Sequence, residues 1–232
     1  MNDYEIAKIC CRLYADDSEK DKFWDRIWTT DGSYAAVKFI EGKPVLVFRG
    51  SSTAYDWYLN FKADPERDGS VGWVPRGFGL GFWPIQDEVM AFLRGSTPIV
   101  TGHSRGAAIA CVAAGIMKCH GITPSKLVIM GCPRPGEDTL RSILSNVPVS
   151  NYKNGSDPVT DVPFYIDLPG EYFDAKYVEV RDFIQLNVKV KCSESWPSTV
   201  EYHHYQNYLY GIGQKFLPEN SDELWYLEHP TV

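Results

Sequence analysis

Strand-like and helix-like segments alternate along the middle of the chain, and this alternation constrains the fold more than any other feature. The apolar run at residues 98–102 is followed by a segment of helical character that ends near Gly121. The apolar run at residues 126–131 is followed by a second such segment, over residues 136–146. A third strand-like run covers residues 147–154. Because neighbouring parallel strands need long crossover connections, this order predicts a mostly parallel central sheet with helices on both faces.

The flanking segments extend the same pattern. Asn2 and Glu5 have the spacing of a capping box and predict a helix at the start of the sequence. Residues 33–40 and 44–48 predict a hairpin that turns at Gly42. Further expected elements are a helix from about residue 84 to 95, a strand over residues 184–190 and a last helix from near residue 203 to 216. No linker-like stretch divides the 232 residues, which predicts a single domain over residues 1–232.

Composition excludes some partners and suggests a compartment. The formal net charge is -7, from 30 acidic and 23 basic residues, which argues against binding nucleic acid or anionic lipid through a basic surface. No segment has the apolar length of a transmembrane span, and the first residues do not resemble a signal peptide. The six cysteines, mostly in apolar runs, are interpreted as reduced thiols. These features predict a cytoplasmic protein, or one released without a leader.

Ser104 stands between the predicted strand over residues 98–102 and the alanine-rich helix, in the sequence Gly-His-Ser-Arg-Gly. In a nucleophile elbow, a serine occupies a strained strand-to-helix turn, and its neighbours must be small. Gly102, Gly106, Ala107 and Ala108 meet that requirement. The alternative is that Ser104 simply caps the helix, since serine is a favoured cap residue.

A serine nucleophile needs a histidine base and an acid to orient it. His203 and His204 follow the predicted strands, and Asp157 and Asp161 follow the strand over residues 147–154. The order serine, acid, histidine is that of an α/β-hydrolase. Packing, helix capping and a tail position are expected for the other three histidines, His103, His120 and His229. A metal site at His203 and His204 is disfavoured, because no Cys-x-x-Cys or His-Glu-x-x-His spacing accompanies this pair.

Seven blocks of sequence carry a resemblance to a known family. They are VFRGSST, AYDWYLNF, VPRGF, GHSRGAA, MGCPRPG, the acid block with Asp157, Val159 and Pro163, and the base block with His203 and Tyr208. In this order the chain resembles the class 3 lipases, the fungal-lipase-like branch of the α/β-hydrolases, over roughly residues 44–208. Three positions depart from the family pattern: Pro75 replaces a histidine, Thr160 a proline and Tyr202 an aspartate.

The resemblance implies a serine carboxylic-ester hydrolase with an α/β-hydrolase fold, an acyl-enzyme intermediate, and neither a cofactor nor a metal. The substrate would be a small-molecule or lipid ester. The implied catalytic residues are Ser104, Asp157 and His203, the last favoured over His204 by its register with Tyr208. The implied oxyanion-hole residues are Ser51 and Arg105, and the candidate lid or acyl-pocket residues are Trp57, Tyr58 and Phe61. For Arg105, a solvated side chain with only the backbone N–H in use is expected. The alternatives are a catalytically idle binding or scaffold domain and an acyltransferase.

Overall fold

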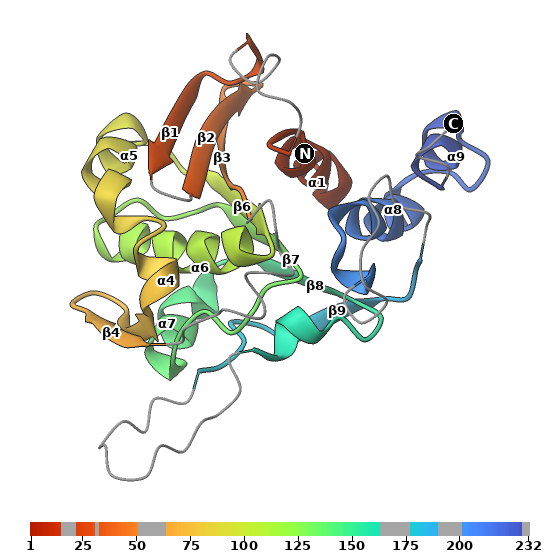
Figure 1. Ribbon diagram of the computed structural model, residues 1–232. Helices are drawn as coiled ribbons and strands as arrows, with labels where there is room; N and C mark the ends of the chain where they lie inside the picture. Colours follow the sequence, from red (N-terminus) through yellow and green to blue (C-terminus); the bar gives the residue numbers. More distant parts are fainter. Residues whose placement is uncertain (15–21, 31–32, 51–63, 163–176, 190–200, 229–232) are drawn as a thin grey trace, which may run out of the picture.

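The computed structural model describes residues 1–14, 22–30, 33–50, 64–162, 177–189 and 201–228. Figure 1 shows a central sheet with helices packed against its faces. Within those ranges the main sheet has seven strands in the order β1-β2-β3-β6-β7-β8-β9. The strands are β1 (Arg26–Thr30), β2 (Ser33–Ile40), β3 (Lys43–Phe48), β6 (Ile99–His103), β7 (Lys126–Met130), β8 (Val149–Asn154) and β9 (Phe183–Leu186).

The pairing of the strands divides the sheet into two parts. β1, β2 and β3 pair antiparallel with one another, whereas β3, β6, β7, β8 and β9 pair parallel. The predicted mostly parallel sheet is therefore confirmed. A separate hairpin consists of β4 (Pro65–Asp68) and β5 (Gly72–Pro75).

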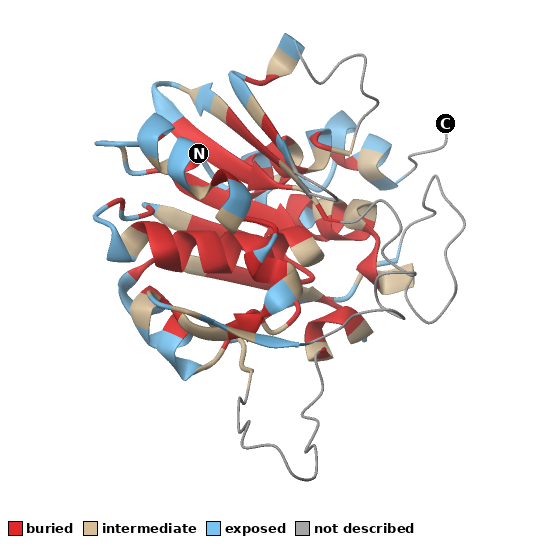
Figure 2. Cartoon of the chain, turned by 60° about the vertical axis from the view of Figure 1, so that its left-hand side comes forward, coloured by how far each residue is buried: buried red, intermediate tan, exposed pale blue. Residues whose placement is uncertain are grey.

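Both faces of the sheet are buried against helices, as the alternation predicted. Leu46 and Phe48 of β3 belong to one apolar core, while Val45 and Val47 belong to the other, because successive strand side chains point to opposite faces. The first core includes α4 (Arg76–Gly79), α5 (Gln86–Phe92), α6 (Arg105–Cys119) and α7 (Asp138–Ile143). The second includes α1 (Asp3–Arg12) and α8 (Tyr205–Phe216), and α9 (Asp222–Glu228) packs on α8. Figure 2 shows buried residues along the strands and α6.

The local signals at the start of the chain have their expected structural effects. Asn2 caps α1 by accepting a hydrogen bond from the Glu5 backbone, and the Glu5 carboxylate accepts one from the Asn2 backbone. The β2–β3 turn places Glu41 and Gly42 at positive φ, a conformation that glycine adopts without strain. The capping box and the hairpin are confirmed.

Some boundaries and elements differ from those expected. The helix expected from residue 84 begins as a 3₁₀ turn, η1 (Trp83–Ile85), and continues as α5. β9 ends at Leu186 rather than near residue 190, because its partner β8 ends at Asn154. The Asn154 side chain then bonds both backbone polar groups of Val188, which replaces a strand partner. β1, the β4–β5 hairpin and α9 were not expected. Three further 3₁₀ turns are η2 (Leu144–Asn146), η3 (Pro158–Asp161) and η4 (Glu201–His203).

Candidate active site

The turn at Ser104 is held in a strained conformation by contacts between backbones. Ser104 has φ 59° and ψ -135°, which is unfavourable for a residue with a Cβ atom. A Cβ atom on Gly102 would lie 2.3 Å from the Gly106 carbonyl oxygen, and one on Gly106 would lie 2.2 Å from the Phe48 oxygen. The glycines are therefore required because α6 crosses β6 and β3 at very short range.

Ser104 occupies the position before α6, but its side chain makes no capping hydrogen bond. Its hydroxyl instead lies 2.7 Å from His203 Nε2. The geometry therefore corresponds to an elbow that presents the serine, and the alternative of a simple helix cap does not describe it.

Ser104, His203 and Asp157 form a continuous hydrogen-bonded chain. His203 Nδ1 lies 2.7 Å from Asp157 Oδ2, and all three residues have no exposed surface. A carboxylate oxygen can only accept, so Nδ1 carries a proton, and in that tautomer Nε2 is the nitrogen that can accept from the serine hydroxyl. The parallel order of β6, β7 and β8 brings the serine and the acid to the same edge of the sheet.

The Asp157 carboxylate is fixed by several donors. Its Oδ1 accepts from the Val159 backbone at 2.9 Å, and its Oδ2 accepts from the Tyr208 hydroxyl at 2.5 Å. The Tyr208 oxygen in turn accepts from the Asn154 backbone at 3.1 Å. Burial by itself raises the pKa of Asp157, but His203, Tyr208 and the Val159 N–H outweigh burial and lower it. The carboxylate is therefore held in its charged form.

The structure distinguishes the two candidate bases and the two candidate acids by position. His204 caps α8, with its Nδ1 accepting from the Gln206 backbone at 3.2 Å. Asp161 forms an ion pair with Lys153 at 3.0 Å. His203 and Asp157 are thus the members of each pair that lie in the chain with Ser104.

His103 has a closer relation to the site than the packing role expected for it. Its ring stacks on the His203 ring at 4.8 Å, and its Nε2 lies 2.8 Å from the His203 carbonyl oxygen. Its Nδ1 lies 2.9 Å from the Tyr14 hydroxyl. Tyr14 follows the end of α1, and it was missed because nothing in its local sequence distinguishes it from the apolar positions of the helix expected there.

The remaining predicted site residues have different outcomes. Arg105 is the first residue of α6 and directly follows Ser104. The expectation of a solvated side chain is wrong, because its guanidinium donates to the Gly77 carbonyl oxygen at 3.0 Å and burial lowers its pKa. Four predicted residues lie outside the described part of the chain: Ser51, Trp57, Tyr58 and Phe61.

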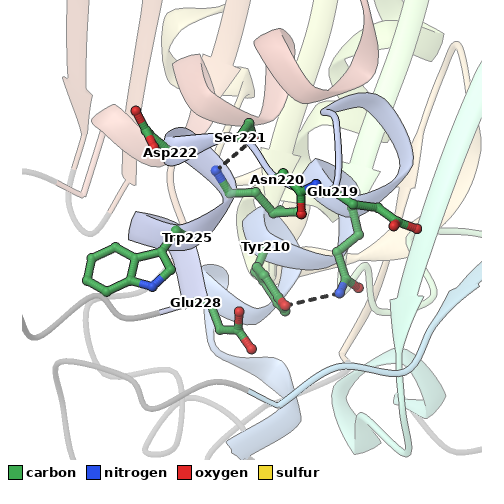
Figure 3. Close-up of a pocket in the computed structure, with 9 residues that line it drawn as sticks. Tyr210, Glu219, Asn220, Ser221, Asp222, Trp225 and Glu228 are labelled. Carbon is green, nitrogen blue, oxygen red and sulfur yellow. Dashed lines mark hydrogen bonds between the residues drawn. The ribbon is translucent and has the colours of Figure 1, made fainter.

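A cavity of about 670 Å³ lies between α8 and α9, apart from the hydrogen-bonded residues Ser104, His203 and Asp157 (Figure 3). Neither Ser104, Asp157 nor His203 lines it. Its lining residues are Tyr210, Gln214, Glu219, Asn220, Ser221, Asp222, Leu224, Trp225 and Glu228. In the described ranges, no group of three or more histidine, cysteine, aspartate or glutamate residues is arranged to hold a metal ion. No helix in this part of the chain is both long and apolar enough to cross a bilayer.

Solved structures of similar fold define the fold class. A mutant form of MDLA from Penicillium cyclopium superimposes with a TM-score of 0.64 at 19% identity, covering 83% of this chain and 80% of that one. A lipase–propeptide complex from Rhizomucor miehei gives 0.61 at 23% identity, covering 69% and 61%. The fold is that of the α/β-hydrolases.

Sequence comparison narrows the class to a family. The profile described as "Lipase (class 3)" matches residues 45–166, and the chain belongs to this family. It is 29% identical over 145 residues to secreted mono- and diacylglycerol lipase 1 of Fusarium solani, covering 57% of this chain and 43% of that protein. It is 28% identical over 169 residues to secreted mono- and diacylglycerol lipase A of Penicillium cyclopium, covering 65% and 54%. The chain thus spans about half the length of these relatives.

The relatives correct the predicted compartment. The three curated relatives are named as secreted proteins, which points to an extracellular protein, so the prediction of a cytoplasmic protein is wrong on this comparison. The first residues form α1, which packs in the second core, so their mixed composition reflects that packing. Buried free cysteines such as Cys10 and Cys111 act as small apolar residues in any compartment. Neither observation bears on where the protein works.

Proposed function

We propose that this protein is a carboxylic-ester hydrolase in which Ser104 is the nucleophile, His203 the general base and Asp157 the acid that orients the base. The observation that carries the proposal is the hydrogen-bonded chain from Ser104 Oγ through His203 to Asp157, with 2.7 Å at each step. A serine hydroxyl is a weak nucleophile at neutral pH, and this arrangement supplies the base that activates it. An idle scaffold would have no need for the strained turn at Ser104.

The reaction proceeds in two stages. In the first, Ser104 Oγ attacks the ester carbonyl while His203 Nε2 takes the hydroxyl proton, and Asp157 stabilises the resulting imidazolium. The bond to the alcohol then breaks, His203 returns the proton to the departing alcohol, and an acyl-enzyme remains. In the second stage, water attacks the acyl carbon while His203 takes a proton from it. The bond between the acyl carbon and Ser104 Oγ then breaks, His203 gives its proton to Oγ, and the acid leaves.

The negative oxygen formed in each stage needs donors that are already in position. The Arg105 backbone N–H is proposed as one donor, because it stands at the start of α6, directly after Ser104. Ser51 is proposed as the second, with its backbone N–H and hydroxyl. The proposed role of Trp57, Tyr58 and Phe61 is to line the acyl pocket or to form a lid.

The proposed substrates are partial glycerides, meaning esters of glycerol with one or two acyl chains. The support is that the curated relatives are named mono- and diacylglycerol lipases. A lipid ester would place its acyl chain against aromatic side chains, which the proposed pocket residues supply.

A fluorophosphonate probe tests the catalytic assignment, because it reacts covalently with an activated serine. Labelling of the wild-type protein at Ser104 and none in Ser104→Ala is the expected result. If Ser104 of the wild-type protein is not labelled, the hydrolase proposal fails and the idle scaffold is favoured.

A chain-length series of nitrophenyl esters, followed by mono-, di- and triacylglycerol emulsions, tests the substrate class. We expect activity on long acyl chains and on partial glycerides, with Ser104→Ala inactive on all of them. Preference for acetyl or butyryl esters would contradict the lipid assignment and leave the esterase chemistry intact. Transfer of the acyl group to an added alcohol in preference to water would indicate an acyltransferase.

A further inference from the structure

A line of hydrogen bonds beside the triad connects three distant segments of the chain. The Gly50 backbone N–H donates to the Tyr14 hydroxyl oxygen at 3.0 Å. Tyr14 is bonded to His103 Nδ1 at 2.9 Å, and His103 Nε2 to the His203 carbonyl oxygen at 2.8 Å. The line therefore runs from the end of β3 past the nucleophile turn to the backbone of the base.

The direction of every hydrogen bond in this line follows from its two ends. The His203 carbonyl can only accept, so His103 Nε2 carries a proton. Burial, together with the adjacent His203, holds the pKa of His103 well below its ordinary value, so its ring is neutral and Nδ1 accepts. Tyr14 must then donate to Nδ1 while its oxygen accepts from Gly50. All three donors point the same way, an arrangement in which hydrogen bonds reinforce one another.

Ring contacts hold the same residues. The Tyr14 ring stacks on Tyr205 with centroids 4.9 Å apart and planes 10° apart, and Tyr205 follows the base region directly. A Cβ atom on Gly50 would lie 2.6 Å from the Tyr14 hydroxyl and 2.8 Å from the His103 carbonyl oxygen. Gly50 thus packs closely against both residues, and it directly precedes the proposed oxyanion donor Ser51.

We propose that Tyr14 and His103 are positioning residues that fix the His203 backbone and the segment entering Ser51 relative to Ser104. The proposal rests on the hydrolase function proposed above. Neither residue touches the reacting atoms; Tyr14 acts through Gly50 and His103, and His103 acts through the His203 carbonyl. Small displacements of a catalytic group by remote contacts lower the rate of the chemical step far more than they affect substrate binding.

Tyr14→Phe tests this proposal, because it keeps the ring that stacks on Tyr205 and removes the hydroxyl. We measure kcat and KM on a nitrophenyl ester and divide kcat by the number of sites titrated with a fluorophosphonate. The expected result is a fall of about 10-fold in kcat per titrated site with KM changed less than about twofold. Since unfolded molecules are not titrated, loss of folding does not register as loss of kcat.

Two substitutions of His103 separate its two hydrogen bonds. The amide nitrogen of His103→Gln can reach the position of Nε2 and donate to the His203 carbonyl, whereas the shorter His103→Asn can satisfy only Tyr14. We expect kcat per site to fall more in His103→Asn than in His103→Gln. Equal kcat in the two variants would overturn the role assigned to the bond with His203.

Tyr4→Phe is the matched control. Tyr4 lies in α1, close to Tyr14 in the sequence, and its hydroxyl donates to Glu223 at 2.9 Å, away from the triad. Its removal should lower stability and leave kcat per site unchanged. Wild-type kcat in Tyr14→Phe, or an equal loss in Tyr4→Phe, overturns the positioning role. Absence of labelling at Ser104 of the wild-type protein would refute the hydrolase function itself. Normal labelling with unchanged kcat in Tyr14→Phe would refute only the positioning role.

Discussion

The serine and the histidine of the candidate site are held in place by different kinds of constraint. Ser104 is fixed by backbone contacts: Gly102 packs against the start of α6, and Gly106 packs against the end of β3. His203 is fixed by two hydrogen bonds: its Nδ1–H donates to Asp157, which is 46 positions away, and its carbonyl oxygen accepts from His103, which is 100 positions away. The serine is therefore held by steric contact between backbones, whereas the histidine is held by individual hydrogen bonds with distant segments.

The difference implies two kinds of response to mutation. Backbone overlap at the serine turn cannot be relieved by rotating a side chain, so a substitution there should affect folding and activity together. A hydrogen bond to the histidine or its acid can be removed singly, and the rest of the site can remain folded. Four predictions test this distinction.

Among substitutions of the groups that hold His203, Asp157→Asn should lower kcat the most. An amide cannot stabilise the imidazolium, and it offers no fixed acceptor that selects the reactive tautomer of His203. We expect kcat to fall by about 10⁴-fold with the fold retained, as measured by ester hydrolysis and circular dichroism. Asp161→Asn, which alters the neighbouring carboxylate bound to Lys153, serves as the control and should change kcat little. Similar losses in both variants would contradict the assignment.

Gly106→Ala should affect the serine side through folding. The new Cβ atom would lie 2.2 Å from the Phe48 carbonyl oxygen and 2.7 Å from the Arg49 carbonyl carbon, both of which are backbone atoms. We expect the free energy of unfolding to fall by about 3 kcal/mol or more, measured by urea titration, with activity lost in parallel. Gly69→Ala, with no atom within 4 Å of the added Cβ, should be close to neutral. A Gly106→Ala variant that is inactive but as stable as the wild-type protein would contradict the expectation that folding and activity are lost together.

Tyr208→Phe should have a moderate effect on stability. It removes one of the two hydrogen bonds to Asp157 Oδ2 and leaves the Asn154 backbone N–H without its acceptor. Hydrogen bonds to a buried charge are among the stronger ones, so we expect the free energy of unfolding, measured by urea titration, to fall by about 2 kcal/mol. Tyr210→Phe, whose hydroxyl accepts from Gln214 beside the α8–α9 cavity, should cost about 0.5 kcal/mol. A larger loss from Tyr210→Phe would reverse the expected order.

The smallest expected effect is a change in how stability depends on pH in the acid range. The pKa of Asp157 is lowered in the folded protein from its ordinary value of 3.8, so its contribution to stability is complete above that value. This contribution is lost as the pH falls through the lower folded pKa. Urea midpoints between about pH 5 and pH 2 should therefore fall more steeply for the wild-type protein than for Asp157→Asn. Parallel curves for the two proteins would show that Asp157 is not ionised by preference in the folded state.

The sequence predicted the parts of the molecule that local patterns encode. Strand and helix periodicity indicated the order β6, α6, β7, α7, β8, and the short spacing of Gly102 and Gly106 indicated the turn at Ser104. The edge strand β1 and the β4–β5 hairpin were missed, because their residues show mixed polarity with no clear alternation. β9 was predicted too long, because the alternation continues past the point where β8 stops supplying a partner.

The sequence by itself determined the fold, the family resemblance and the residue types of the triad, because those depend on periodicity and on motifs within short windows. The family resemblance already favoured His203 over His204 and Asp157 over Asp161. The hydrogen bonds that join these residues to Ser104, and the contacts of Tyr14 and His103 beside them, came only from the tertiary structure. Adjacent residues of one type look alike in a sequence. Only the packing of α1 and α8 on the parallel sheet determines which of them lies within hydrogen-bonding distance of Ser104 and its partners.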